Sequence, residues 1–406
     1  MKCDIGREWA WTKIGRICKT NVSSYSPSER WPFVNYLETK GISEGRISEI
    51  QHLLLPKQSL PCRARRKVSK NDIVYSTVRP NQRHYGIIKE PLPNMLVSTG
   101  FSVLTVDPAQ CDAAFLYYWL SQNHIVETLQ ALAEQSVSTF PTIRDADLEA
   151  LEILLPPLPE QKRIAAILSA LDDKIELNNK INANLERQAQ ALFKTWFEDV
   201  SLERLPFGWR FVTFGDVVTI SKRIFSPSAV SEMQLEHYSI PAFDEGRFPV
   251  FESSTSVKSN KFIVDKDCFM ISKLNPTTKR VWRPYCLSET AVCSTEFIVY
   301  KAKDVNMTDF LYSVVDSATF SDFMCSHVTG STGSRQRTNP SETLAFELVV
   351  PSDDKLLEFQ SIVAPMYARI RANAIENDRL RRIRDAVLPK LMSGEIDVSD
   401  VSFPKL

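Results

Sequence analysis

The chain has 406 residues, which is too long for one ordinary domain. Its hydrophobic content of 43% and charged content of 24% are typical of a soluble globular protein. Lys and Arg together number 49, as do Asp and Glu, so the formal net charge is zero. This balance argues against a wholly basic nucleic-acid binder, but it leaves room for local basic surfaces.

The sequence shows neither a membrane span nor a secretion signal. It has no run of about 18 apolar residues, and its first residues, MKCDIGREWAW, lack the apolar core of a signal peptide. We therefore expect a cytoplasmic location. The eight cysteines include no C-x-x-C pair, which predicts free thiols and no metal site.

Residues 1–155 combine strand and helix patterns. Residues 74–80 and 95–106 are rich in β-branched and aromatic side chains, which predicts strands. Residues 111–135 have the apolar spacing of one or two helices. This segment is therefore expected to be a mixed domain of the α+β or α/β type.

Residues 156–200 are predicted to form one long helix. A proline cluster (Pro156, Pro157 and Pro159) opens it, and apolar residues then recur at spacings of three and four, as on one helix face. At ~1.5 Å per residue such a helix reaches roughly 55–60 Å, which is longer than a domain core needs. A helix of this length is expected to pack against a partner.

The second half of the chain repeats the first at a shift of 195 to 200 positions. Residues 115–117 (Phe-Leu-Tyr) match residues 310–312, and residues 154–156 match residues 349–351. We therefore predict a second domain at 201–351, a second long helix at 352–398 and a short tail at 399–406. A repeat this long is a domain duplication, not a solenoid.

The repeat also aligns two asparagines of one helix with two of the other. Polar residues within an apolar seam set the register of a coiled coil at some cost in stability. We therefore expect the two helices to pack against each other. The predicted seam consists of Leu171, Ile175, Asn178, Asn182, Leu185, Met366, Ile370, Asn373, Asn377 and Leu380.

A search for catalytic motifs finds none that is complete. The chain lacks the phosphate-binding G-x-x-x-x-G-K-[ST] string and the NPPY or DPPY string of amino-methyltransferases. Residues 160–162 match the E-x-K half of some nuclease sites, but they fall at a helix start. The five histidines form no spaced pair. We predict no catalytic residue, no metal and no cofactor on this chain; the rival hypothesis is a fused methyltransferase or nuclease.

Basic and polar residues gather in loops at matching places of the two domains. Arg, Asn and Gln can pair bidentately with guanine or adenine edges, while other basic residues contact phosphates. The alternative for each residue is an ordinary solvated loop. The predicted DNA contacts in the first domain are Arg63, Arg65, Arg66, Lys67, Arg79, Asn81, Gln82, Arg83, His84, Tyr85, Ser138 and Thr139. Those in the second domain are Lys273, Asn275, Thr277, Thr278, Lys279, Arg280, Ser334, Arg335, Gln336 and Arg337.

The whole chain resembles the specificity subunit of type I restriction-modification systems. The resemblance is carried by residues 155–165 (LPPLPEQKRIA), residues 380–395 (LRRIRDAVLPKLMSGE), residues 77–80 (TVRP) and residues 98–101 (STGF). It implies an α+β chain with two tandem target recognition domains separated by two long helices that form an antiparallel coiled coil. Each domain would recognise half of a split double-stranded DNA target. Residues 351–355 (PSDDK) depart from the PLPEQ string at the start of the second helix.

The resemblance also implies partners. Two modification subunits would dock on the helices and methylate adenine, and restriction (motor-nuclease) subunits would complete the enzyme. S-adenosylmethionine, ATP and Mg would all bind the partner subunits. A methylation-only or type IIB-like system is an alternative, as is, less favourably, a protein-binding scaffold.

Antiparallel pairing has a specific consequence for the seam. It would place Asn178 near Asn377 and Asn182 near Asn373, which predicts a central layer of amide side chains.

Overall fold

The computed structural model describes residues 9–55, 57–136, 140–198, 200, 204–329 and 336–401. The chain divides into two compact units: unit 1 comprises residues 1–173 and 380–406, and unit 2 comprises residues 174–379. Two long helices, α5 (Leu158–Phe193) and α10 (Asp353–Met392), contribute to both units. Each unit is thus one predicted domain completed by part of each helix, whereas the sequence suggested separate helical segments.

Unit 1 contains two four-stranded sheets, a two-stranded ribbon and a small hairpin. The first sheet has the order β6 (Gln51–Leu54), β3 (Phe33–Leu37), β10 (Met95–Ser98), β7 (Ala64–Lys67). The second has the order β2 (Cys18–Thr20), β11 (Phe101–Val106), β8 (Ile73–Ser76), β9 (Tyr85–Ile87). The ribbon pairs β1 (Ala10–Lys13) with β12 (Glu152–Leu155), and the hairpin pairs β4 (Ile42–Ser43) with β5 (Arg46–Ile47). The helices are α1 (Ile14–Ile17), α2 (Ala113–Ser121), α3 (Asn123–Glu134) and α4 (Asp145–Glu149).

Unit 2 has a similar arrangement, but one of its two larger sheets has five strands. One sheet has the order β14 (Val218–Ser221), β22 (Phe297–Ala302), β19 (Cys268–Ser272), β20 (Val281–Trp282). The other has the order β15 (Ile224–Phe225), β18 (Lys261–Ile263), β21 (Ala291–Ser294), β16 (Gln234–Tyr238), β17 (Val250–Ser253). The two-stranded sheets are β13 (Arg210–Thr213) with β25 (Glu347–Val350) and β23 (Val328–Thr329) with β24 (Arg337–Thr338). The helices are α6 (Phe214–Val217), α7 (Ile240–Gly246), α8 (Thr308–Val315) and α9 (Ala318–Ser326).

The register of the ribbons supports the duplication at the level of single residues. In unit 1, Ala10 pairs with Leu155, and in unit 2, Arg210 pairs with Val350. The two partners are displaced by 200 and 195 positions, the shifts that the sequence predicts for the front and the back of the repeat. Because each repeat ends by pairing its last strand with its first, each globular domain closes before its long helix begins.

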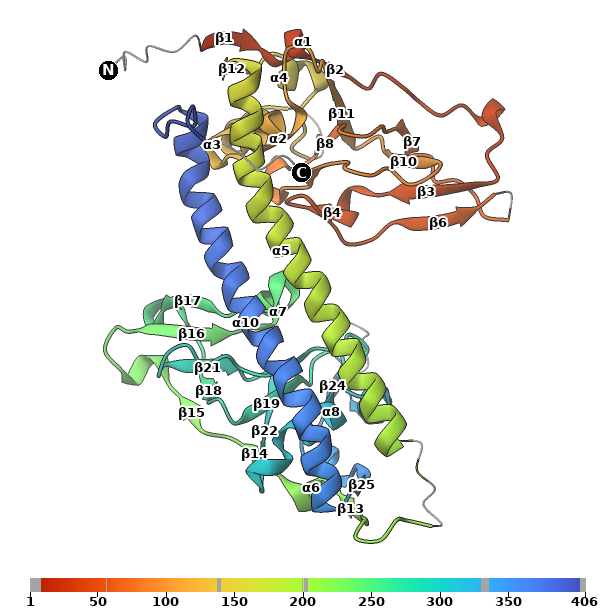
Figure 1. The fold of residues 1–406 in the computed structure, drawn as a ribbon, viewed down its shortest axis with the longest axis vertical. Coiled ribbons are helices and arrows are strands. Elements are labelled where there is room, and N and C mark those ends of the chain that lie inside the picture. Colours follow the sequence, from red (N-terminus) through yellow and green to blue (C-terminus); the bar gives the residue numbers. More distant parts are fainter. Residues whose placement is uncertain are drawn as a thin grey trace. The chain divides into compact units, whose positions relative to one another are not determined.

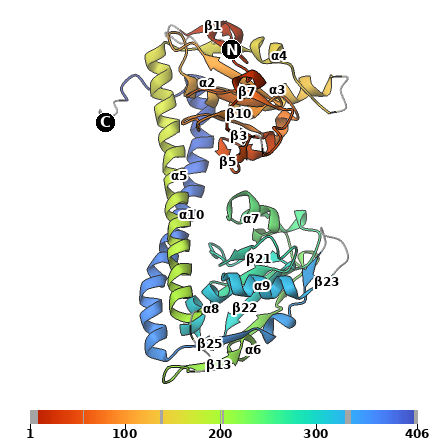
Figure 2. The same ribbon diagram turned by 90° about the vertical axis from the view of Figure 1, so that its right-hand side faces the viewer.

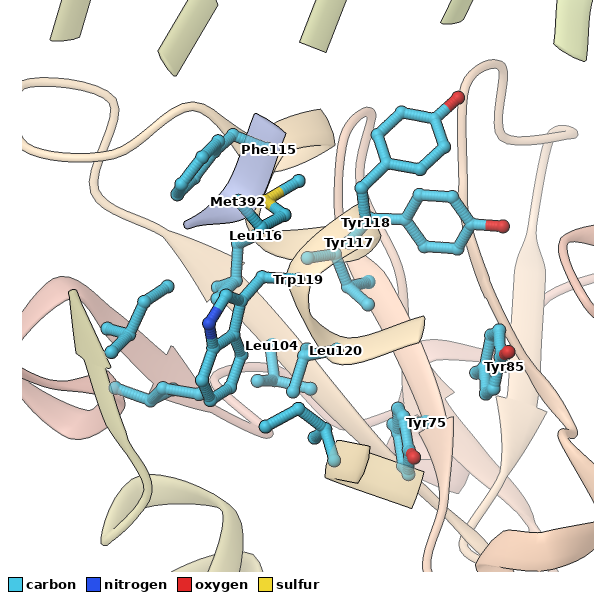
Figure 3. Packing of buried hydrophobic residues seen from close by; sticks show 14 of the residues in the cluster. Tyr75, Tyr85, Leu104, Phe115, Leu116, Tyr117, Tyr118, Trp119, Leu120 and Met392 are labelled. Atoms are coloured by element: carbon cyan, nitrogen blue, oxygen red, sulfur yellow. The ribbon is translucent and has the colours of Figure 1, made fainter. Parts of the chain in front are cut away.

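The core of unit 1 joins the sheet of β2, β11, β8 and β9 to the helices (Figure 3). Phe115 and Leu116 of α2 are fully buried, and Met392 of α10 lies in the same cluster. Tyr75 and Tyr85 stack with their ring centroids 5.3 Å apart. Packing of α10 side chains into this core explains why residues 380–392 belong to unit 1 although they lie far from it in sequence.

Unit 2 holds its helix ends with aromatic side chains. The end of α5 continues as a π-helical turn, η4 (Lys194–Glu198), and Phe197 in that turn contacts Phe359 of α10 at a centroid distance of 5.0 Å. Phe310 of α8 lies 5.2 Å from Phe197 in an edge arrangement. Edge contacts between aromatic rings add to the stabilisation that burial alone provides.

Within unit 2, α5 and α10 lie side by side in both views (Figures 1 and 2). Asn178 Nδ2 donates to Asn377 Oδ1 at 2.9 Å, and Asn373 Nδ2 donates to Asn182 Oδ1 at 2.7 Å. These are the two pairs that antiparallel packing predicts. Asn178, Asn373 and Asn377 are at most 2% exposed. The predicted amide layer is therefore present.

Unit 1 fixes the start of α5 through a buried amide. Gln161 is completely buried; its Oε1 accepts the backbone N–H of Asp112 at 2.8 Å, and its Nε2 donates to the carbonyls of Gln110 and Pro156. Farther along α5, Asp172 accepts from Arg384 of α10 at 2.7 Å. The PLPEQ string thus contributes a side chain that joins the helix to its domain. In unit 2, α10 begins at Asp353 without that string.

Candidate nucleic-acid interface

The end of β8 carries a turn whose backbone is pinned on several sides. Ser76 Oγ donates to the carbonyl of Val78 at 2.9 Å and accepts the N–H of the same residue. The N–H of Arg79 donates to the carbonyl of Pro141, and the carbonyl of Arg79 accepts the N–H of Gln82, each at 2.9 Å. We call residues 76–82 the β8 turn.

The end of β19 carries the same turn. Ser272 Oγ donates to the carbonyl of Leu274 at 3.0 Å and accepts its N–H. The N–H of Asn275 donates to the carbonyl of Gln336, and the carbonyl of Asn275 accepts the N–H of Thr278, each at 2.9 Å. We call residues 272–278 the β19 turn. Each bond has its counterpart in the β8 turn.

The corner residue of each turn has a left-handed backbone and precedes a buried proline. The φ angle is 48° at both Arg79 and Asn275. Asn adopts this region more readily than most residues, whereas an arginine there is uncommon. Unusual backbone conformations held by surrounding bonds concentrate at functional sites. The two units therefore place different residues at the corner of one backbone frame.

In unit 1 the β8 turn projects its corner side chain toward solvent. Arg79 is exposed, and its guanidinium carbon lies 4.9 Å from the ring centroid of Phe140, which is 51% exposed. Asn81 and Gln82 are also exposed, and so is Arg63. Arg65 is partly buried and donates to the carbonyl of Cys62.

Other residues of the predicted unit 1 site face the protein instead. The Arg66 side chain is 17% exposed, and its guanidinium donates to Asn21 Oδ1 and to the carbonyl of Phe101. Burial lowers the pKa of Arg66. Tyr85 is 3% exposed and stacks in the core. Arg66 and Tyr85 therefore pack inside unit 1. Neither is exposed on the surface, where the sequence predicted a DNA contact.

Three further residues of that site are partly engaged. Lys67 Nζ lies 2.5 Å from Glu29 Oε2 and 5.1 Å from the centre of the Trp31 ring. Arg83 donates to Asn123 Oδ1 at 2.8 Å, and His84 Nδ1 lies 2.7 Å from the carbonyl of Ile42. A DNA contact by Lys67 or Arg83 would have to compete with these partners.

In unit 2 three of the predicted basic residues are paired with carboxylates. Arg280 donates bidentately to Asp244 at 2.6 and 2.8 Å, and Arg337 donates bidentately to Glu296 at 3.0 Å on both arms. The hydrogen bonds and charge of Glu296 raise the pKa of Arg337. Lys279 Nζ lies 2.8 Å from Asp316 Oδ1. These pairs reduce the positive charge that unit 2 presents.

The remaining residues of the unit 2 prediction are neutral or partly buried. Thr277 and Thr278 are exposed on the β19 turn, and Lys273, Asn275 and Gln336 are partly buried. No described residue donates to Asn275 Oδ1, which is buried. Predictions at Ser138, Thr139, Ser334 and Arg335 lie outside the described residues.

The predicted site residues do not include Phe140 or the acidic partners. Asp244 lies 36 residues from Arg280, and Glu296 lies 41 residues from Arg337. Only the fold brings these groups together. The duplication matches residues 136–140 with residues 331–337, and the sequence prediction selects Ser138 and Thr139 of that loop but not Phe140.

Over the part of the chain that the structure describes, no cluster of three or more His, Cys, Asp or Glu side chains could hold a metal ion. The described cysteines are all unpaired with one another. No described helix has the length and apolar character needed to cross a membrane.

Comparisons with known proteins agree on one class. The profile of a family described as type I restriction modification DNA specificity domain matches residues 13–187. The specificity subunit of the type I restriction enzyme HindI from Haemophilus influenzae is 25% identical, over 96% of this chain and 100% of its own length. The MjaIX specificity subunit from Methanocaldococcus jannaschii is 24% identical, over 98% of this chain and 96% of its own length.

A solved structure shares the fold. The crystal structure of a type I restriction-modification S subunit from M. genitalium aligns with a TM-score of 0.53 at 18% identity, covering 96% of this chain and 98% of that one. Two tandem mixed domains with two long helices are thus a known architecture.

Proposed function

The chain belongs to the family of type I restriction-modification specificity subunits, and from this premise we propose that it recognises a bipartite DNA target, one half with each globular domain. Proteins of this family confer DNA sequence specificity and are themselves non-catalytic.

The observation that carries the proposal is the pair of matched turns. The β8 and β19 turns share their hydrogen bonds and their φ angle of 48° at the corner, yet the corner residue is an exposed arginine in one and a partly buried asparagine in the other. A common frame with different side chains suits two half-sites of different sequence, because base-edge contacts specify sequence and depend on the side chain.

We propose that the partners are two modification subunits that methylate adenine and restriction subunits that join them. Exposed apolar side chains on both helices are consistent with docking there: Leu177 is 51% exposed, Leu357 58% and Ile383 43%. We further propose that S-adenosylmethionine, ATP and Mg bind those partners and that the complex works in the cytoplasm. A methylation-only or type IIB-like assembly remains the alternative.

Selection from a pool of random DNA duplexes tests the proposal. The chain, purified with its modification subunits, is mixed with the pool, and the bound duplexes are sequenced at two salt concentrations. We expect two short fixed motifs separated by an unspecified spacer of constant length. Affinity should fall as salt rises, since phosphate contacts release counterions.

A sequence-blind and salt-insensitive result would favour the scaffold hypothesis. Methylation or cleavage by the purified chain alone would instead favour a fused enzyme. Adding restriction subunits and ATP to the bound target separates a restricting system from a methylation-only one, because only the former cuts the DNA.

A further inference from the structure

We propose that the β8 turn is a base-recognition element of the first half-site and that Arg79 at its corner selects a guanine. This inference rests on the proposed function and adds a residue and a base to it.

The turn holds its corner residue in a fixed orientation. Within the turn, the N–H of Thr77 donates to the carbonyl of Gly100 at 2.8 Å, which connects the turn to the loop between β10 and β11. With the bonds of Ser76 and Arg79 already described, the turn is attached at both ends. In unit 2 the N–H of Lys273 donates to the carbonyl of Glu296 at 2.9 Å in the same way. A pre-organised loop loses little conformational freedom on binding.

The left-handed backbone of Arg79 is energetically unfavourable for an arginine. A non-glycine residue in a sparsely populated conformation lowers the folding equilibrium constant by about 5- to 160-fold, and it persists where the surroundings impose that conformation. Asparagine at the matching position of unit 2 tolerates this conformation. Arg30, Arg83 and Arg247 also have a left-handed backbone, so the conformation alone does not single out Arg79. What distinguishes Arg79 is its place at the corner that the Ser76 hydrogen bonds frame.

The surroundings of Arg79 leave its donors available. Within the described part of the chain, no carboxylate lies within ion-pair distance of Arg79, whereas Arg280 and Arg337 each have one. The contact with Phe140 supports the guanidinium by a cation–π interaction without using its N–H groups. Arg79 thus combines a fixed backbone, a supported side chain and exposed donors.

Guanine is the base that this arrangement suits. The guanidinium offers two parallel N–H groups, and guanine presents the O6 and N7 acceptors side by side in the major groove. A phosphate could accept the same two donors, but a phosphate contact would carry no sequence information. The two outcomes can be distinguished by experiment.

The test compares Arg79→Asn with the wild-type chain in the random-duplex selection. Asparagine fits the left-handed corner, so the substitution tests the side chain without straining the turn. We expect one position of the first half-site to lose its guanine preference by about 5- to 160-fold, the discrimination of a bidentate contact. The second half-site and the spacer should stay unchanged.

Lys13→Ala is the matched control, because it removes one exposed positive charge from β1, away from the turn. It should leave every position of the motif unchanged. An unfolding midpoint of Arg79→Asn equal to that of the wild type checks that the turn is intact.

Two results would overturn the inference. In one, Arg79→Asn keeps the full motif and the full affinity. In the other, it keeps the motif while affinity falls equally for all sequences, which identifies a phosphate contact. If the wild-type chain itself selects no split motif, the proposed function fails, and that outcome is separate from either result for the variant.

Discussion

The amide layer between α5 and α10 in unit 2 allows a quantitative prediction. Asn178 Nδ2 donates both to Asn377 Oδ1 at 2.9 Å and to Glu376 Oε2 at 2.8 Å. Asn377 in turn donates to Asn179 Oδ1 at 2.9 Å. Asn178→Ala removes two hydrogen bonds and leaves the buried Asn377 Oδ1 without that donor.

The magnitude follows from these contacts. Each lost bond contributes about 0.5–1.5 kcal/mol, and the acceptor left behind costs about 1–3 kcal/mol. One effect acts in the opposite direction, since the buried Oδ1 of Asn178 has no donor among the described residues and the substitution removes it. We expect Asn178→Ala to lower the free energy of unfolding of unit 2 by roughly 2 kcal/mol.

The double variant Asn178→Leu, Asn377→Leu is the decisive comparison. Replacing both partners by apolar groups of similar size can be neutral or stabilising, because neither of the two buried amides is then left without its partner. Glu376 and Asn179 also lose a donor, but Asn179 is exposed and the Glu376 side chain is 43% exposed, so water can replace it. Urea unfolding of the wild-type chain, of Asn178→Leu, of Asn377→Leu and of the double leucine variant completes a double-mutant cycle. The reasoning is refuted if Asn178→Ala unfolds at the wild-type midpoint, or if the double leucine variant is less stable than Asn178→Ala.

Three further predictions concern single side chains. Gln161→Ala should lower the free energy of unfolding of unit 1 by about 2–4 kcal/mol, because it leaves three backbone groups unpaired; a midpoint unchanged in urea would contradict this. Arg66→Met should destabilise unit 1 and leave the selected DNA motif intact, so a changed motif at unchanged stability would restore Arg66 as a DNA contact. Burial lowers the pKa of His237 from 6.5, against the opposing hydrogen bond of Glu252 and with a further lowering by the charge of Lys261. The unfolded state therefore binds the proton more readily, so unit 2 should lose stability as the pH falls below about 6.5. Unfolding midpoints measured from pH 7.5 to 5 should fall in the wild type and flatten in His237→Gln; equal slopes would contradict the assignment.

The sequence predicted the features that depend on periodicity and repetition. The shifts of 200 and 195 reappear as the pairing of Ala10 with Leu155 and of Arg210 with Val350. The helix pattern predicted α5 and α10, and the aligned asparagines predicted which amides meet. Such features repeat along the chain, so each copy supports the prediction for the other.

The charged surface was harder to predict, because it depends on partners that are distant in sequence. Arg66 looked like part of a basic run, but Asn21 and the carbonyl of Phe101 hold it inside the fold. Tyr85 resembled an interleaved aromatic of a DNA site, yet strand β9 directs it into the core. Arg280 is paired through an acidic residue on α7 that no local pattern relates to it.

The backbone conformation of the β8 and β19 turns could not be predicted from the sequence either. The loops were predicted from their polar residues, but the left-handed corner and the serine bonds that frame it are properties of folded chains. The serine bonds separate Arg79 from Arg30 and Arg83, whose backbones are also left-handed.

The central claim is that one chain recognises two DNA half-sites. Mapping N6-methyladenine across the genome of cells that carry this chain with its modification subunits tests it most directly. We predict a single split motif, with two fixed halves and a spacer of constant length, that disappears when the gene for this chain is deleted. A continuous motif, or methylation that persists without this chain, would contradict the account.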